Sequence, residues 1–315
     1  MVNEKRVISM LPSAAETICL CGGESMLVGR GHEDDEPSSI KHLPVVTGSS
    51  TVFTSSLDVD IQVSAAITQG NALYTIDADT LKSLNPTHIV TQDLCHVCAI
   101  DLQTVERIAS QMSQKPEIIT LNPLTFSDVL EDIGRIGRAL GLDEGAAAAV
   151  ERLNARVEKS RSVADRLLAA NGGVRKRCLF VEWTDPVYPG GHWTPQLIYM
   201  AGGNQPIASA TDLVGAGPSV RVTHEMCIES DPEVIVISPC GLDLEAARRE
   251  ADLIRDKDWF KQMLKPGVRV CLVDGNQMFN RPGPRLVDAL EFLVAFVWGK
   301  EELVPKGFPW EKYIG

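Results

Sequence analysis

The segment from Asp143 to Ala170 constrains the fold of this chain more than any other. It is rich in Ala, Arg and Glu, carries apolar residues at helical spacing, contains no strand pattern and is followed by Asn171-Gly172-Gly173. These features predict one long helix, because a glycine after the last turn readily takes the left-handed conformation that ends a helix. At about 1.5 Å per residue, the helix would be roughly 40 Å long, enough to reach from one lobe of a protein to another.

Strand patterns alternate with helix patterns on both sides of this predicted helix. Before it, the apolar runs HIV (88–90) and EIITL (117–121) each precede a stretch with helical spacing. After it, CLFVEW (178–183), VIVIS (234–238) and VRVCLVD (268–274) do the same. Such alternation is typical of a mainly parallel sheet with helices packed on its faces.

The expected fold is therefore an α/β protein of two lobes, each a mainly parallel sheet flanked by helices, joined by one long helix. The 315 residues exceed the usual domain length of about 100–200 residues, which supports two lobes with separate cores. We expect the N-terminal α/β lobe in residues 1–142, the connecting backbone helix in 143–170 and the C-terminal α/β lobe in 171–315. We also expect this helix to be the only substantial element that links the lobes.

The charge of the chain argues against several classes of partner. Lys and Arg total 30 against 42 Asp and Glu, a formal charge of -12, and the longest basic run is RKR (175–177). Proteins that bind nucleic acid usually present a basic surface to the phosphates, so we expect no nucleic-acid partner. The longest apolar run, 289–298, is too short to span a bilayer, and no membrane insertion is expected.

The N-terminal residues and the cysteines bear on the compartment. The opening MVNEKRVISMLPSAAE lacks the apolar core of a signal peptide. We therefore expect the chain as given to be cytoplasmic, and periplasmic only if a signal peptide has been removed. Several of the eight cysteines lie in apolar strand or helix patterns, where a thiol behaves as a small hydrophobic group, and we expect all eight to be reduced.

Ligands of open parallel sheets bind at the carboxyl ends of the strands, so the residues that follow each strand are candidates for a site. After the first strand, Ser13 lies three residues before Glu16, the spacing of a helix capping box. His32 is followed by four acidic residues. This segment is either a solvated acidic turn or holds an imidazole with a raised pKa that faces a ligand or a metal. Gln92 follows the strand HIV.

Cys95 and Cys98 form a Cys-x-x-Cys pair just after Gln92, and three interpretations are open. A structural zinc site usually takes four ligands, whereas this chain has one such pair. A redox dithiol is favoured by the predicted helix start, because a helix N-terminus lowers a thiol pKa. In the third interpretation, the pair lies on one wall of a binding site.

A second group of candidates follows the strands of the C-terminal half. Aromatic rings and an imidazole crowd a loop rich in Gly and Pro, where they would form either a stacking surface or packing over the loop: Trp183, Tyr188, His192 and Trp193. Polar candidates follow the next two strands: Cys240, Asn276 and Arg281.

Six segments of the chain carry a family resemblance, in order and over nearly its whole length: RVISMLPSAAETICLCGGESMLVGRGHEDDEP, LPVVT, TQDLCHVCAI, FVEWTDPVYPGGHWTPQLIYMAGG, DPEVIVISPCG and DGNQMFNRPGPRLVDALE. They resemble the cobalamin-binding branch of the class III substrate-binding proteins of ABC importers. The resemblance implies two α/β lobes joined by one rigid helix, a ligand held in the cleft, limited hinge closure and, if the chain is exported, an ABC permease as partner. Bacterial relatives often read His-Glu-Cys-Asp where this chain has Asp34 in place of the Cys.

The leading functional hypothesis is non-catalytic binding of a large planar small-molecule ligand, cobalamin or another corrinoid, in the cleft, with no cofactor required. Aromatic side chains would stack on the ligand, polar side chains would meet its amides, and an imidazole would approach its metal. The expected ligand-binding residues are Ser13, His32, Gln92, Cys95, Trp183, Tyr188, His192, Trp193, Cys240, Asn276 and Arg281.

The alternative hypothesis is a metal-dependent or thiol-dependent enzyme, or a metal carrier, that holds zinc or iron. Soft and imidazole ligands from both lobes would form its centre: His32, Cys95, Cys98, His192 and Cys240. The chain has no Ser-His-Asp order, glycine-rich phosphate loop or His-Glu-x-x-His motif, which argues against a hydrolase or a kinase. We expect a binding protein rather than an enzyme.

Overall fold

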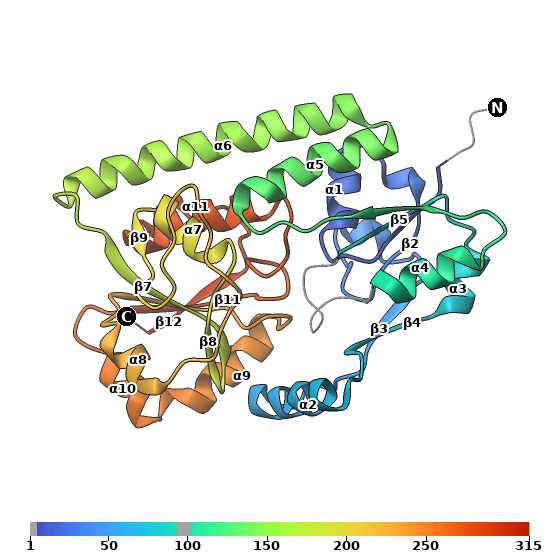
Figure 1. Cartoon of the computed structure of the whole chain (residues 1–315). Helices are drawn as coiled ribbons and strands as arrows, with labels where there is room; N and C mark the ends of the chain where they lie inside the picture. Colours follow the sequence, from blue (N-terminus) through green and yellow to red (C-terminus); the bar gives the residue numbers. More distant parts are fainter. Residues whose placement is uncertain (1–4, 93–101, 315) are drawn as a thin grey trace.

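The computed structural model describes residues 5–92 and 102–314 and consists of two α/β lobes joined by the helix α6 (Asp143–Ala170). This helix runs along both lobes (Figure 1) and has the predicted bounds. It packs against helices of the first lobe on one part of its length and against a helix of the second lobe on another. We retain residues 142 and 170 as our proposal for the domain boundaries.

The first lobe is built on a parallel sheet with the strand order β2-β1-β5-β6. Its strands are β1 (Val7–Ser9), β2 (Leu27–Gly29), β5 (His88–Thr91) and β6 (Glu117–Thr120). Its helices are α1 (Ala14–Leu20), α3 (Ala78–Ser83), α4 (Leu102–Ser110) and α5 (Phe126–Leu140). Successive side chains of β1 lie on opposite faces of the sheet. Val7 packs in the core formed with α1 and α5, and Ile8 packs in the core formed with α3 and α4.

The second lobe has a larger sheet with the order β12-β11-β10-β7-β8 and β9 paired to β7. Its strands are β7 (Lys176–Thr184), β8 (Val187–Pro189), β9 (Gly203–Asn204), β10 (Val234–Ile237), β11 (Arg269–Val273) and β12 (Trp310–Ile314). Its helices are α7 (Thr194–Met200), α8 (His224–Glu229), α9 (Leu244–Arg255), α10 (Asp258–Met263) and α11 (Leu286–Val297). The central strands are parallel and the strands β8 and β12 are antiparallel to their neighbours.

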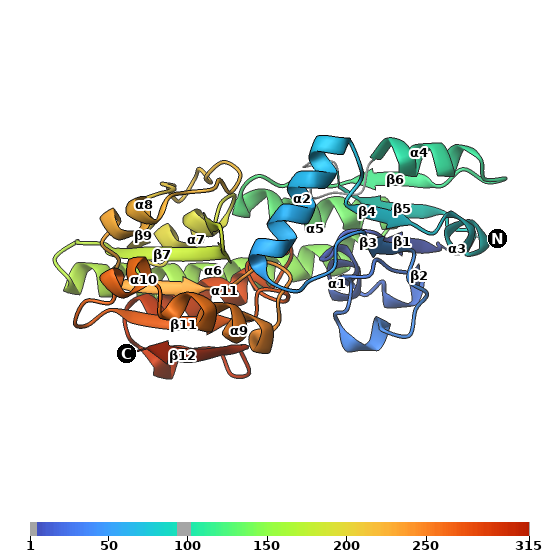
Figure 2. The ribbon, with the colours of Figure 1, turned by 90° about the horizontal axis from the view of Figure 1, so that it is seen from below.

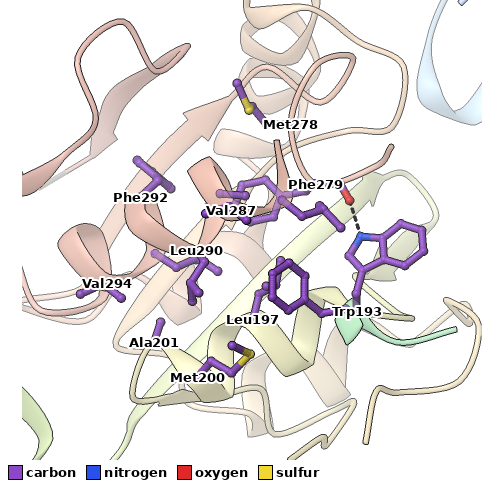
Figure 3. Close-up of a cluster of buried hydrophobic side chains, with 14 of the residues drawn as sticks. Trp193, Leu197, Met200, Ala201, Met278, Phe279, Val287, Leu290, Phe292 and Val294 are labelled. Atoms are coloured by element: carbon purple, nitrogen blue, oxygen red, sulfur yellow. Dashed lines mark hydrogen bonds between the residues drawn. The ribbon is translucent and has the colours of Figure 1, made fainter. Parts of the chain in front are cut away.

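A continuous apolar core joins the second lobe to α6 and α5. Figure 3 shows the part of it where Leu197 and Met200 of α7 meet Leu290 of α11. Phe279 and Phe292 are fully buried in the same cluster, with ring centroids 6.5 Å apart. This packing fixes α7 and the loop before it, which carries several of the predicted site residues. In the described residues, no helix combines the length and the apolar character needed to cross a membrane.

An arm of the first lobe reaches the second lobe, a contact that the sequence analysis did not predict. The antiparallel strands β3 (Thr47–Ser49) and β4 (Tyr74–Ile76) form a ribbon that carries the helix α2 (Ser56–Gln69). Figures 1 and 2 both place α2 where the lobes meet, away from the sheet of its own lobe. The backbone N–H of Ser56 donates to Glu250 of α9 over 3.0 Å. The chain still passes from one lobe to the other once, through α6, as predicted, and the arm adds a noncovalent contact between the lobes.

Candidate ligand site between the lobes

An open pocket lies between the two lobes, with an enclosed volume of about 260 Å³ and about 1130 Å³ when the open space at its mouth is included. Its first wall consists of five residues of the first lobe. Four of them follow strands, namely Leu11, Pro12, Glu33 and Gln92, and Tyr74 is the first residue of β4. The second wall consists of residues of the second lobe, with Glu182 in β7, Thr194 in α7 and the others in loops: Gly191, His192, Trp193, Pro218, Cys240, Gly241, Gly275, Asn276, Phe279, Asn280, Arg281 and Pro282. Six of the predicted ligand-binding residues are therefore brought together: Gln92, His192, Trp193, Cys240, Asn276 and Arg281.

His32 lines a smaller adjoining pocket with an enclosed volume of about 20 Å³, which shares Pro12, Glu33, Tyr74 and Gln92 with the large one. Its Nδ1 lies 2.7 Å from the hydroxyl of Thr47, which fixes the ring at the start of the arm. Burial lowers the pKa of His32 and outweighs the opposing effect of Glu33. Of the two interpretations of this segment, the one with a raised His32 pKa is not supported, because burial of the imidazole lowers its pKa more than the charge of Glu33 raises it.

Trp193 forms a fixed, buried part of the second wall. Its side chain is only 7% exposed, and its indole N–H donates to the carbonyl of Phe279 over 2.6 Å (Figure 3). The preceding residue, His192, has a φ of 51° and exchanges backbone hydrogen bonds with the loop at Gly217 and Ala216. Burial lowers the pKa of His192, so its imidazole is neutral near pH 7 and can act as a metal ligand.

Trp183 and Tyr188 lie elsewhere, against the arm. They are paired across β7 and β8, so that both side chains project from one face of the sheet. The indole N–H of Trp183 donates to the carbonyl of Ser56 over 3.0 Å, and the hydroxyl of Tyr188 donates to Asp60 over 3.2 Å. Neither residue lines the pocket between the lobes. Of the three large rings predicted to stack on a ligand, the structure thus places only Trp193 in the pocket wall.

The lobes also meet at Arg281, a residue of the pocket wall that is 8% exposed. Its guanidinium binds the carboxylate of Asp35 over 2.7 Å and the side-chain carbonyl of Asn276 over 2.8 Å. Partial burial acts to raise the pKa of Asp35, but the hydrogen bond and charge of Arg281 outweigh it, and the pKa is lowered. Two predicted ligand-binding residues, Asn276 and Arg281, therefore also hold the lobes together.

Ser13 contributes to the same contact and not to a capping box. Its hydroxyl donates to the carbonyl of Pro282 over 2.7 Å, and no side-chain bond caps α1. Glu16 pairs instead with Arg285 of the second lobe at 2.8 Å. The capping-box prediction was wrong, because both side chains have partners across the lobe interface.

Glu182 is a pocket residue that the sequence analysis did not select. Its carboxylate accepts hydrogen bonds from the hydroxyl of Ser219 at 2.9 and 3.0 Å and from the backbone N–H of Gly191 at 3.4 Å. The sequence did indicate Glu182 as a candidate, because it is a charged residue near the carboxyl end of the predicted strand. Side chains alternate between the two faces of a strand, so Glu182 points to the opposite face of β7 from Trp183.

The residues of the alternative metal-centre hypothesis are not all described. Cys95 and Cys98 lie outside residues 5–92 and 102–314. Within the described ranges, no group of three or more His, Cys, Asp or Glu side chains is placed to hold a metal ion. The thiols of Cys19, Cys21, Cys178, Cys227 and Cys271 are free, as expected.

Comparison with solved structures identifies the fold. A periplasmic haem-binding protein from Pseudomonas aeruginosa is similar with a TM-score of 0.71 and 18% identity, covering 99% of this chain and 98% of that chain. The periplasmic vitamin B12-binding protein BtuF of Vibrio cholerae is similar with a TM-score of 0.63 and 16% identity, covering 95% of this chain and 98% of that chain. The periplasmic haem-binding protein BhuT in complex with two haems is similar with a TM-score of 0.67 and 20% identity, covering 94% of this chain and 98% of that chain.

These likenesses confirm the predicted architecture, since the neighbours are class III periplasmic substrate-binding proteins and match the chain along nearly its full length. No protein-family model and no curated protein sequence matches this chain.

Proposed function

We propose that this chain, which has the fold of the class III substrate-binding proteins, is a non-catalytic binding protein for cobalamin or another corrinoid. The observation that carries the proposal is the open pocket between the lobes, which residues of both lobes line. Many of these residues follow the carboxyl ends of strands, the position at which open α/β sheets bind ligands.

The openness of the pocket favours a large ligand. Its enclosed volume is about 260 Å³, below the roughly 300–1,000 Å³ of sites for drug-sized molecules, so a larger ligand must extend into the open space at its mouth, which brings the total to about 1130 Å³. A corrinoid is a broad ring with a metal at its centre, so an open groove between two lobes suits it better than a closed cavity. Known neighbours with this fold bind haem, vitamin B12 or an iron(III)-hydroxamate, which supports a metal chelate as the ligand class.

Three features of the pocket wall suit a corrinoid. The indole of Trp193 gives an apolar surface for the ring. The amides of Gln92 and Asn276 from opposite lobes can exchange hydrogen bonds with the peripheral amides of the ligand. The neutral imidazole of His192 can approach the cobalt from the second wall.

An ABC permease is the proposed partner, by analogy with solved neighbours that serve ABC transporters. Other solved neighbours are periplasmic proteins, which does not support the cytoplasmic location expected from the sequence. We therefore favour the second of the two expected locations, the periplasm.

Isothermal titration of the purified protein with cobalamin and with cobinamide tests the proposal. Cobinamide lacks the lower nucleotide, so it separates recognition of the ring from recognition of the nucleotide. We expect one equivalent of cobinamide to bind with a Kd of about 1 μM or lower, which corresponds to about -8 kcal/mol. Haemin and a ferric hydroxamate serve as comparison ligands. Failure of both corrinoids to bind, with binding of either comparison ligand, would reassign the ligand.

A further inference from the structure

Glu182 places a carboxylate in the wall of the pocket at the end of β7. The donors that hold it are the hydroxyl of Ser219 and the backbone N–H of Gly191. A carboxylate has about four lone-pair positions, so these two donors leave acceptor capacity unused. Burial acts to raise the pKa of Glu182, which means that its charge is costly in this environment and that a further hydrogen-bond donor would stabilise it.

The other charges of the pocket do not offset this carboxylate. Arg281 is the cation among the described lining residues, and its guanidinium is already bound to Asp35 and Asn276. Glu33 adds a second carboxylate on the opposite wall. A ligand with carboxylates along its edge would therefore meet like charges, whereas a ligand edged with primary amides would offer N–H donors.

We propose that Glu182 is a specificity-determining residue, which accepts hydrogen bonds from primary amides at the edge of a corrin ring and disfavours rings edged with carboxylates. The inference rests on the proposed function and adds to it the feature of the ligand that is recognised. It predicts discrimination between two ligands that share ring and metal and differ only in the side groups.

Dicyanocobinamide and dicyanocobyrinic acid are such a pair, with amides and carboxylates respectively on the same cobalt corrin. Titration of the wild-type protein should give a Kd for cobinamide at least about 100-fold lower than for cobyrinic acid. Glu182→Gln should reduce the ratio of the cobyrinic acid Kd to the cobinamide Kd about 10-fold or more. The substitution removes both the charge repulsion of the ligand carboxylates and the anionic hydrogen-bond acceptor. The matched control is Glu245→Gln on the exposed face of α9, which changes the net charge equally and should leave the ratio unchanged.

Ser219→Ala gives a second test that keeps the carboxylate. Removal of the hydroxyl donor leaves Glu182 with more unused acceptor capacity, so the ratio should rise several-fold. A ratio near one in the wild-type protein, or a ratio that neither Glu182→Gln nor Ser219→Ala alters, would overturn the inference while leaving corrinoid binding intact. If the wild-type protein binds neither corrinoid, the proposed function itself fails.

Discussion

The indole N–H of Trp183, in the second lobe, donates a hydrogen bond to the backbone carbonyl of Ser56, in the arm of the first lobe, over 3.0 Å. The hydroxyl of Thr184 donates to the hydroxyl of the same serine over 2.8 Å. Ser56 is the one described residue of α2 that is buried, so the helix is held against the second lobe mainly at its N-terminal end.

Glu250 should control the attachment of this arm. Its carboxylate is buried and accepts from the backbone N–H of Ser56. Glu250→Ala leaves that donor without its partner, and we expect the amides of residues 56–69 to exchange hydrogen for deuterium about 10-fold faster or more. Glu245→Ala, on the exposed face of the same helix, is the control. Equal exchange in both variants would show that the arm does not depend on Glu250.

Gly283 should be intolerant of a side chain, because its backbone lies against Ser13 at the lobe contact. A Cβ at position 283 would lie 2.6 Å from the Cβ of Ser13. Gly283→Ala must therefore separate the lobes locally, and we expect a loss of about 1–3 kcal/mol in the free energy of unfolding. Gly217→Ala is the matched control, since a Cβ there meets no atom within 4 Å. Urea unfolding compares the two, and equal stability of both variants would contradict the contact.

Trp193 should affect stability as well as binding, because it is both a core residue and a wall residue. Trp193→Ala removes a buried ring and its hydrogen bond to Phe279, and we expect the free energy of unfolding to fall by about 3–5 kcal/mol. Trp193→Phe keeps most of the ring and should cost about 1–2 kcal/mol. Denaturant unfolding measures both values. A loss below 1 kcal/mol for Trp193→Ala would mean that the side chain is not packed as described.

Asp34 should make stability depend on pH. The residue is 1% exposed, and burial raises its pKa from 3.8 to about 7. Between these values the folded protein retains a proton that the unfolded chain has lost, so stability is greatest at low pH and falls as the pH rises through 7. The effect amounts to at most about 4 kcal/mol.

Asp34→Asn cannot lose a proton and should remove this contribution. Urea unfolding from pH 4.5 to 8 should therefore show the variant gaining stability relative to the wild-type protein as the pH rises. Parallel pH curves for the two proteins would contradict a protonated Asp34.

The long helix and the central strands could be predicted because local patterns determine them. Gly172 follows α6 with a φ of 68°, and the Val234–Ile237 strand is fully buried, as a run of apolar residues predicts. The arm could not be predicted in this way. In α2, Leu57, Val59 and Ile61 alternate with polar residues, which is typical of a strand, whereas the Ser55 cap and Gly70 favour the helix that forms.

The position of the pocket was predictable, but the contacts of several side chains were not. The rule that ligands bind at strand ends identified residues such as His192 and Cys240, which do line the pocket. The partners of Ser13 and Trp183 come from distant parts of the chain, Pro282 and Ser56, and no local pattern reveals such contacts. For the same reason, neither side chain was expected to hold the lobes together.

The most direct test of the central claim is a titration with cobinamide of a variant whose pocket is filled. Cys240 is an exposed residue of the pocket wall, so Cys240→Trp places an indole in the space proposed for the ring while leaving the core intact. Val174→Trp, at an exposed position just after α6, is the control. The account predicts one equivalent bound at about 1 μM or tighter by the wild-type and control proteins, and at least 100-fold weaker binding by Cys240→Trp. Unchanged affinity in the Cys240→Trp protein would show that the ligand binds elsewhere, and the absence of binding of both cobinamide and cobalamin to the wild-type protein would contradict the proposed function.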